Sequence, residues 1–437
     1  MDRFPHLKIT DERGSHYAEA SRLALFIGGV PFEDERISHE ELVELEPKLP
    51  YGRLPSNSIL RFAGRLGGLY PVSNPLAALR VDEILHALEE FEVKVAACFE
   101  GATPEALKEE LLIQEVPRYF ALIDARLERM MELSFFREKM TEVFVHDLAL
   151  YAWITRLHSR ELESITTEML DKFRHVNETV AKVHAHPKVK EWNVLSHDEQ
   201  VSKPVTPERT TKRPSATADA YPDPMPQPKL RLAYFFSSGR AEPIRLALAI
   251  GDVAFEDEHL SSTDFTIVKP TLPFHQLPVL HVNGYAPVAQ SYAILRYAGT
   301  LSDLYPATDA LKALRVDELL SVLDEGQNHP LWSESYIEDP DRKLQMRSII
   351  SRDTIPKMLG WLEDRVDGRV GTYSTSNELT IADLAIASLL QFLESGSLEG
   401  VPPDVVKPYK NLTRIVNLVN NHPKVKTWRE THPLPTP

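Results

Sequence analysis

Residues 242–260 read EPIRLALAIGDVAFEDEHL, and residues 19–37 read EASRLALFIGGVPFEDERI. The two stretches match at an offset of 223 positions, so that Arg22 corresponds to Arg245. Because long-range self-similarity is the signature of a duplicated architecture, this match decides how the chain is organised. Three further matches extend it: SILRFAGRLGGLYP (58–71) with AILRYAGTLSDLYP (293–306), ALRVDE (78–83) with ALRVDE (313–318), and HPKVKEW (186–192) with HPKVKTW (422–428). The two halves are therefore predicted to be duplicates.

The offset rises from 223 to 235 after the first match, which means that the first half lacks about 12 residues. The residues without a counterpart lie between Pro278 and Ser291. There PVLHV alternates and is β-branched, Asn283 and Gly284 form a type I′ turn signal, and YAPVAQ runs back. We therefore expect a β-hairpin in the second half. The first half has lost both strands, either as a degenerated copy or through an omitted exon.

Each half is predicted to combine a small α/β layer with an all-helical domain. A short strand at 230–236 precedes a turn and an amphipathic helix at 241–250, whereas apolar residues recur at helical spacing from 310 onward. Seven prolines fall within 201–229, and apolar periodicity is almost absent there, which predicts an extended linker. The expected domains are an α/β layer at 1–72, a helical domain at 73–195, a proline-rich linker at 196–228, an α/β layer at 229–306 and a helical domain at 307–437.

Composition and charge exclude several classes of protein. The 437 residues include 64 acidic and 49 basic side chains, and the formal charge of −15 disfavours binding to nucleic acid. The single cysteine, Cys98, excludes intrachain disulfides and thiolate-rich zinc sites, and the 16 histidines show no ligand spacing, so no metal is expected. We find neither a signal-peptide pattern nor a run of about 18 apolar residues, which predicts a cytoplasmic protein without a membrane span.

Four stretches of the second half carry a family resemblance: AYFFSSGRAEPIRLAL (233–248), TLPFHQLPVL (271–280), QSYAILRYAG (290–299) and LTIADLAI (379–386). They resemble the cytosolic glutathione S-transferases of the sigma-like class over most of 229–430, and the first half resembles that family through its repeat identity. The resemblance implies two tandem units, each a thioredoxin-like N-domain followed by an all-α C-domain, with the hairpin absent from the first. It also implies a detoxifying transferase that conjugates glutathione, its co-substrate, to electrophilic small molecules.

The resemblance assigns thiol activation to Tyr234 at the end of the first strand, supported by Arg240 in the turn. The thiolate is the nucleophile, and lowering a thiol pKa by about two units takes roughly 2.7 kcal/mol of preferential anion stabilisation. A phenol hydroxyl together with a helix N-terminus can supply that. The alternatives are that Tyr234 is only a strand aromatic and that Arg240 is a solvated charge at the helix start.

Glutathione binding is implied for a second set of residues. The dipeptide Leu277–Pro278 matches the family's cis-proline, whose free main chain meets the cysteinyl part of the peptide like an added strand. Ser291 opens a helix whose N–H groups suit the γ-glutamyl carboxylate, and the alternative is a plain N-cap. The acidic residue that the family uses across its dimer corresponds to Asp324 or Glu325, with a solvated face as the alternative. The full expected set is Phe265, Lys269, Gln276, Leu277, Pro278, Gln290 and Ser291.

Two further motifs of the second half are assigned, one to the acceptor pocket and one to folding. Trp332 and Tyr336 are expected to line the acceptor pocket, with ordinary helix packing as the alternative, and the electrophile itself is not determined by the sequence. Thr380 and Asp383 form an N-capping box ahead of a buried helix. That box is a folding device and not part of the site.

The first half lacks the corresponding chemistry. The offset of 223 places Asp11 opposite Tyr234 and Tyr17 opposite Arg240, while Ser15 is best explained as a turn residue. We therefore expect a non-catalytic first unit. Two other functions stay open: a non-catalytic structural or interaction protein on this fold, and a glutathione-dependent isomerase of the prostaglandin synthase type. The duplicated surfaces predict an intrachain pseudo-dimer, with a homodimer as the alternative.

Overall fold

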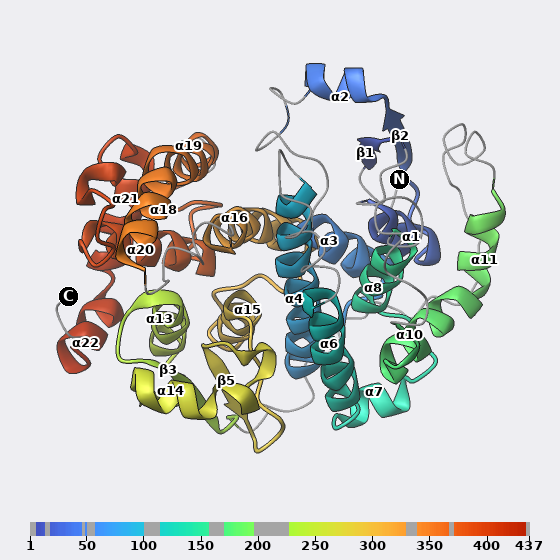
Figure 1. The fold of residues 1–437 in the computed structure, drawn as a ribbon, viewed down its shortest axis with the longest axis horizontal. Coiled ribbons are helices and arrows are strands. Elements are labelled where there is room, and N and C mark those ends of the chain that lie inside the picture. The colour runs from blue at the N-terminus through green and yellow to red at the C-terminus, as the bar shows by residue number, and fades with distance from the viewer. Residues whose placement is uncertain are drawn as a thin grey trace. The chain divides into compact units, whose positions relative to one another are not determined.

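The chain divides into two compact units in a computed structural model (Figure 1). Unit 1 contains Met1–Leu88 and Gly101–Pro224, and unit 2 contains Glu89–Glu100 and Met225–Pro437. The change of unit after Pro224 falls inside the predicted linker, which lies outside the described residues except for 227 and 228. The structure describes residues 6–13, 18–45, 49, 57–99, 114–156, 170–195, 227–328, 339–366 and 371–433.

Unit 2 begins with a three-stranded sheet in the order β4-β3-β5. The central strand β3 (Leu230–Phe235) pairs in parallel with β4 (Glu256–Leu260) and antiparallel with β5 (Val279–Val282). Leu230, Leu232 and Ala233 of β3 are buried. The helices beside the sheet, which pack against each other, are α13 (Glu242–Ile250) and α15 (Ser291–Leu301) (Figure 1).

The predicted hairpin is present in unit 2 in reduced form. Asn283 and Gly284 have φ angles of 52° and 80°, the positive values that a type I′ turn requires. The returning segment makes only a bridge between Val288 and Leu280, so the expected second strand YAPVAQ is not formed as a strand. Between β4 and β5 the chain forms α14 (Ser262–Val268) and two 3₁₀ turns, Lys269–Thr271 and Pro273–His275.

The rest of unit 2 is helical. Its centre is α20 (Ile381–Glu394), which is apolar nearly all round and packs against α13, α16 and α21. The backbone N–H of Thr380 donates to Asp383 across 2.8 Å, and the Thr380 hydroxyl donates to the same carboxylate. The predicted capping box is therefore confirmed. The helices in the described ranges are α16 (Ala310–Asn328), α18 (Pro340–Ile349), α19 (Ile355–Arg365), α20, α21 (Lys410–Asn421) and α22 (Pro423–Thr431), with a π turn at Ile350–Thr354 and a 3₁₀ turn at Pro403–Val406.

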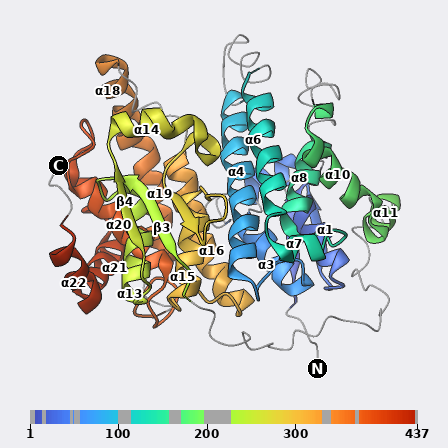
Figure 2. The ribbon, with the colours of Figure 1, turned by 90° about the horizontal axis from the view of Figure 1, so that it is seen from below.

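Unit 1 has a smaller α/β layer. Its described residues contain one parallel pair, β1 (Lys8–Glu12) and β2 (Glu33–Ile37), whose register matches that of β3 and β4 residue for residue at the offset of 223. The helices α4 and α6 lie side by side, joined by Arg126 and Glu83 at 2.9 Å (Figure 2). The helices of this half are α1 (Glu19–Ile27), α2 (His39–Leu45), α3 (Asn57–Gly67), α4 (Pro75–Phe99), α6 (Val116–Met130), α7 (Ser134–Glu138), α8 (Val145–Arg156), α10 (Arg174–Ala185) and α11 (Pro187–Val194).

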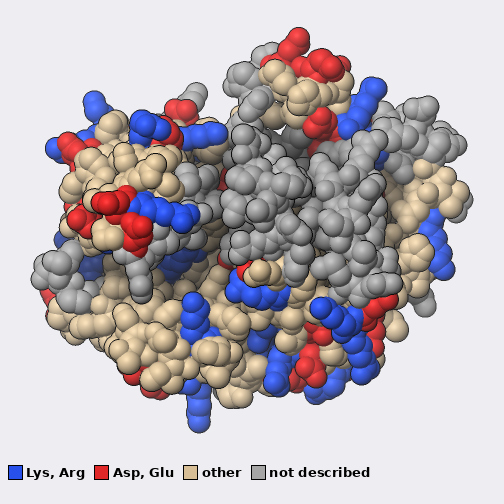
Figure 3. Space-filling view, viewed as in Figure 1, with Lys and Arg blue, Asp and Glu red and all other residues tan. Residues whose placement is uncertain are grey.

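The described surface carries charges of both signs. Basic and acidic side chains are interspersed over the face shown in Figure 3. None of the helices in the described ranges is long and apolar enough to span a bilayer.

Candidate active site

The side chain of Tyr234 is positioned by strand β3 and by the turn that follows it. The tyrosine pairs with His259 of β4, and its ring centroid lies 5.4 Å from that of Phe235. The backbone N–H of Arg240 donates a hydrogen bond to the phenol oxygen across 3.2 Å. Since the oxygen accepts this bond, the phenol proton can be donated to another group. A positioned hydroxyl donor is what stabilisation of a thiolate requires.

Arg245 holds the turn after β3, although in the sequence it stood out only as a repeat position. Its Nε lies 2.9 Å from Oδ2 of Asp257 on β4, and its Nη1 donates to the carbonyl oxygen of Ser237 across 2.7 Å. Its Cζ lies 5.8 Å from the centroid of the Tyr234 ring. Because the guanidinium is a rigid fork, this one buried side chain fixes β4, the turn and the tyrosine relative to one another.

Arg240 connects the same turn to the helical domain of unit 2. Its Nη2 donates to the main-chain oxygen of Gln327 and to Oδ1 of Asn328, both across 2.8 Å. Asn328 in turn donates to Asp324, which is buried within α16. Arg240 therefore contacts the phenol of Tyr234 through its backbone, and its guanidinium anchors the turn to the C-terminal end of α16.

The loop before β5 groups several residues of the expected glutathione set. The Leu277–Pro278 peptide bond is cis, as the resemblance implied. The ring of Phe265 on α14 lies 5.2 Å from that of Phe235, and Nζ of Lys269 lies 5.6 Å from the centroid of Phe265. These residues, which are distant in sequence, thus gather around the end of β3.

The N-terminus of α15 carries Gln290 and Ser291. Gln290 is the N-cap residue, with φ of 73° and ψ of 101°, a conformation that residues with side chains rarely adopt. Its side chain does not cap the helix, and Ser291 is the first helical residue. The alternative that Ser291 is a plain N-cap is therefore wrong. Strained backbone of this kind clusters at ligand sites, and an uncapped helix N-terminus suits an anion.

Glu90 also belongs to this site, and the sequence analysis missed it. It lies in the C-terminal half of α4, within the segment Glu89–Glu100 that is part of unit 2. Its carboxylate oxygens accept hydrogen bonds from Nε2 of Gln276 at 2.8 Å and from Nε2 of Gln290 at 3.2 Å. The repeat could have revealed it, because the offset of 235 aligns Glu90 with Glu325, one of the two acidic residues considered there.

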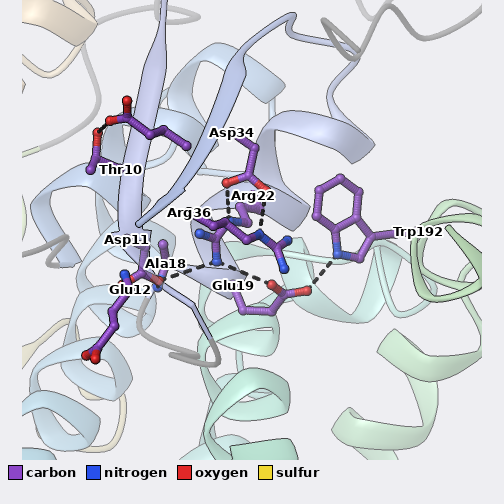
Figure 4. Close-up of polar contacts among 10 residues, drawn as sticks. Thr10, Asp11, Glu12, Ala18, Glu19, Arg22, Asp34, Arg36 and Trp192 are labelled. Atoms are coloured by element: carbon purple, nitrogen blue, oxygen red, sulfur yellow. Dashed lines mark hydrogen bonds and ion pairs between the residues drawn. The ribbon is translucent and has the colours of Figure 1, made fainter. Parts of the chain in front are cut away.

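In unit 1 the register position of Tyr234 is occupied by Asp11, as the alignment predicted. The carboxylate of Asp11 accepts a hydrogen bond from the backbone N–H of Ala18 across 3.1 Å, and it lies 3.4 Å from Nη1 of Arg22 (Figure 4). A buried carboxylate at this position disfavours an adjacent thiolate through like-charge repulsion. Ser15 and Tyr17, the other residues compared in this turn, lie outside the described residues.

A further ion pair of unit 1 joins Arg22 to the neighbouring strand β2. Nε of Arg22 donates to Asp34 across 2.8 Å, and Nε of Arg36 donates to the same carboxylate across 2.9 Å (Figure 4). In unit 2, by contrast, the equivalent Arg245 uses Nη1 to hold main chain of the active-site turn. Both arginines therefore pair with the acidic residue of the neighbouring strand, Asp34 or Asp257, and Arg245 in addition holds the tyrosine turn.

Comparison with known proteins identifies the family of the chain. The family model described as "Glutathione S-transferase, C-terminal domain" matches residues 90–194 and 327–432. The chain is 31% identical over 202 residues to the hematopoietic prostaglandin D synthase of Mus musculus, covering 46% of this chain and 95% of that protein. The chain belongs to the glutathione S-transferase family.

Two further glutathione S-transferase relatives cover the same share of the chain. Glutathione S-transferase 1 of Ascaris suum is 30% identical over 211 residues, which are 47% of this chain and 98% of that protein. The solved prostaglandin synthase D of Nilaparvata lugens is 28% identical and covers 47% of this chain and 100% of its own, with a TM-score of 0.43. Each relative thus corresponds in length to about half of this chain.

The acceptor pocket predicted for this glutathione S-transferase falls on residues that the structure does not describe, because Trp332 and Tyr336 both lie within 329–338. A groove of about 400 Å³ lies along α21, with Lys407, Lys410 and Arg414 among its lining residues. None of the residues predicted for glutathione, all of which the structure describes, lines that groove.

Proposed function

We propose that unit 2 conjugates glutathione to electrophilic small molecules, with Tyr234 as the thiol-activating residue. The observation that carries this proposal is the hydrogen bond from the backbone N–H of Arg240 to the phenol oxygen. A phenol held in this way has its proton to donate, and such a donor stabilises a thiolate sulfur more than a thiol. Membership of the glutathione S-transferase family supports the same reaction.

The donors and acceptors around Tyr234 match the groups of glutathione. In this proposal the γ-glutamyl carboxylate binds at the N-terminus of α15, near the hydroxyl of Ser291. The γ-glutamyl ammonium pairs with Glu90, which already accepts hydrogen bonds from two glutamines of the site. The main chain of Leu277 meets the cysteinyl part of the peptide, and Lys269 faces the glycyl carboxylate.

The reaction requires little covalent chemistry from the protein itself. One sulfur–carbon bond forms and the bond between that carbon and its leaving group breaks, while the thiol proton passes to solvent. Tyr234 stays protonated and donates to the sulfur throughout. Arg240 and Arg245 act on the tyrosine, because they hold the turn that carries the N–H donor and the strand that carries the ring.

The proposal also covers the class of the protein, the organisation of its two halves, its role and its location. We assign the chain to the sigma-like class on the motif at 233–248, and we infer two tandem units of which the first lacks the hairpin and is non-catalytic. The buried pair of Asp11 and Arg22 supports a non-catalytic first unit. A detoxifying role and a cytoplasmic location follow from the family resemblance.

Two specific observations favour other functions. The similarity to a prostaglandin D synthase favours glutathione-dependent isomerisation, which needs the same thiolate and differs in its acceptor. The ion-paired Asp11 in unit 1 favours a structural or interaction role for at least that half of the chain.

One set of assays on the full chain distinguishes these functions. We expect retention on immobilised glutathione, elution by an S-alkylated glutathione, and turnover of a dinitrohalobenzene. Turnover of a prostaglandin endoperoxide without consumption of glutathione would identify the isomerase instead. Failure to bind glutathione and to turn over either substrate would leave the structural role.

A further inference from the structure

The phenol of Tyr234 occupies the space that a side chain at Gly239 would need. The φ angle of Gly239 is +40°, and a Cβ built there would lie 2.5 Å from the phenol oxygen, 3.0 Å from Cε1 and 3.1 Å from Cζ of Tyr234. Real Cβ atoms essentially never show a contact of 2.5 Å, so one of the two groups must move when a side chain is added. The glycine is thus required by position as well as by backbone conformation.

The turn around Gly239 is fixed on both sides. Arg240 is bound through its guanidinium to Gln327 and Asn328, and the carbonyl oxygen of Ser237 is held by Arg245. The backbone N–H of Glu242 donates to the carbonyl oxygen of Ser238 across 3.0 Å. The phenol oxygen, at the far end of its side chain, accepts a hydrogen bond from this same turn. An added Cβ therefore displaces the phenol rather than the turn.

The internal repeat offers a natural comparison. At the offset of 223 the position of Gly239 is His16 in the first half, where Tyr234 is replaced by Asp11. The glycine is thus present in the half that has the tyrosine and absent from the half that lacks it. That pattern is expected if the glycine serves the tyrosine and not the turn as such.

We propose that Gly239 is a positioning residue that sets the place of the Tyr234 hydroxyl. The N–H of Arg240 donates a hydrogen bond to the phenol oxygen, and the absence of a side chain at 239 leaves the space that this oxygen occupies. A side chain at 239 weakens the donation from the hydroxyl to the thiolate sulfur, while the groups that hold the rest of glutathione stay in place. This inference rests on the proposed function.

The test compares Gly239→Ala with Gly284→Ala in the full chain. Gly284 has φ of +80° with nothing within 4 Å of a built Cβ, so it carries the same backbone requirement without the contact. We expect Gly239→Ala to lower kcat by about tenfold or more, to leave KM for glutathione within about threefold, and to raise the pKa of the bound thiol by about one unit in the pH profile. Gly284→Ala should leave kcat and the thiol pKa unchanged.

A double-mutant cycle with Tyr234→Phe isolates the contact. Removing the hydroxyl removes the atom nearest to the built Cβ, so Gly239→Ala should have little further effect on kcat in that background. An equal loss in both backgrounds, or wild-type kinetics in Gly239→Ala, overturns the inference. If the single variant fails to unfold cooperatively, recovery of cooperative unfolding in the double variant supports the contact and its absence refutes it.

The same cycle separates this inference from the proposed function. Unchanged turnover in Tyr234→Phe refutes the tyrosine as activator, whatever Gly239 does. Reduced turnover in Tyr234→Phe together with wild-type behaviour of Gly239→Ala refutes only the positioning role.

Discussion

Nη1 of Arg22 and Oδ2 of Asp11 lie 3.4 Å apart, and both side chains are at most 1% exposed. In unit 2 the equivalent Nη1, that of Arg245, donates to the carbonyl oxygen of Ser237. The aspartate at the register position of the tyrosine therefore supplies an additional carboxylate beside the arginine of unit 1.

We expect Asp11→Ala to destabilise unit 1 by about 3 kcal/mol, because it removes a partner of a buried cation and leaves Arg22 with fewer compensating charges. Hydrogen exchange of α1 amides, read at the peptide level, measures the loss. Lys139→Ala breaks the exposed pair with Glu142 in the same unit and should cost less than about 1 kcal/mol. Equal effects of the two substitutions would contradict a structural role for the buried pair.

Stability of unit 1 should fall in mild acid because of His146. Burial lowers the pKa of its imidazole from 6.5 to about 4, although Asp147 acts in the opposite direction. Nδ1 of His146 has no hydrogen-bond partner in the part of the chain that the structure describes. Because the folded pKa lies below the unfolded one, the unfolded chain binds more protons between these values. The stability is fully present above about pH 6.5, and about 3 kcal/mol of it is lost as the pH falls to about 4.

Urea unfolding followed between these two pH values tests this dependence. His146→Leu should remove most of it, whereas His39→Leu, at a side chain that is 72% exposed, should leave it intact. A wild-type slope in His146→Leu would assign the acid sensitivity to other groups.

Tyr234→Phe should lower conjugation at least about tenfold and leave the affinity for glutathione largely unchanged, since the hydroxyl acts on the thiolate more than on the thiol. Steady-state kinetics and calorimetry provide the two measurements. Tyr285→Phe is the matched control, because Tyr285 is 39% exposed at the hairpin turn. Full turnover in Tyr234→Phe would move the activator to another residue, with Ser237 and Ser238 next to be tested.

Ser291→Ala should weaken glutathione binding by about 1 to 3 kcal/mol, the effect of removing a hydrogen bond to a charged group. Titration calorimetry measures it directly. Ser262→Ala changes the same residue type at the first position of α14 and should leave binding unchanged. A loss at Ser291 of only a few tenths of a kcal/mol would show that the main-chain N–H groups alone hold the carboxylate.

The duplicated sequence predicts that the two halves pair within one chain, because family members pair through homologous surfaces. Light scattering should then give a mass near that of a single chain, 49.5 kDa. Tethering favours such pairing by raising the effective concentration to about the millimolar range. Twice that mass, with second halves paired between chains, would contradict the internal pair.

The sequence by itself determined the features that depend on neighbouring residues or on repetition. The match of 19–37 with 242–260 established the duplication, Asn283 and Gly284 set the turn, and Thr380 set the start of α20. Turn chemistry, helix capping and apolar spacing act over a few residues, so they can be recognised before the fold is known. The replacement of the tyrosine by Asp11 could be predicted for the same reason, from alignment alone.

Only the tertiary structure decided how the site is held. Four features depend on residues that packing brings together. They are the φ angle of Gln290, the hydrogen bond from Arg245 to the turn, the close approach of Gly239 to the phenol, and the hydrogen bonds to Glu90. Neither the apolar periodicity nor the secondary-structure propensity of the sequence specifies such distances. The distances depend on how strands and helices pack against each other within a close-packed unit. The sequence therefore identified the tyrosine, and the packing around it determined where its hydroxyl lies.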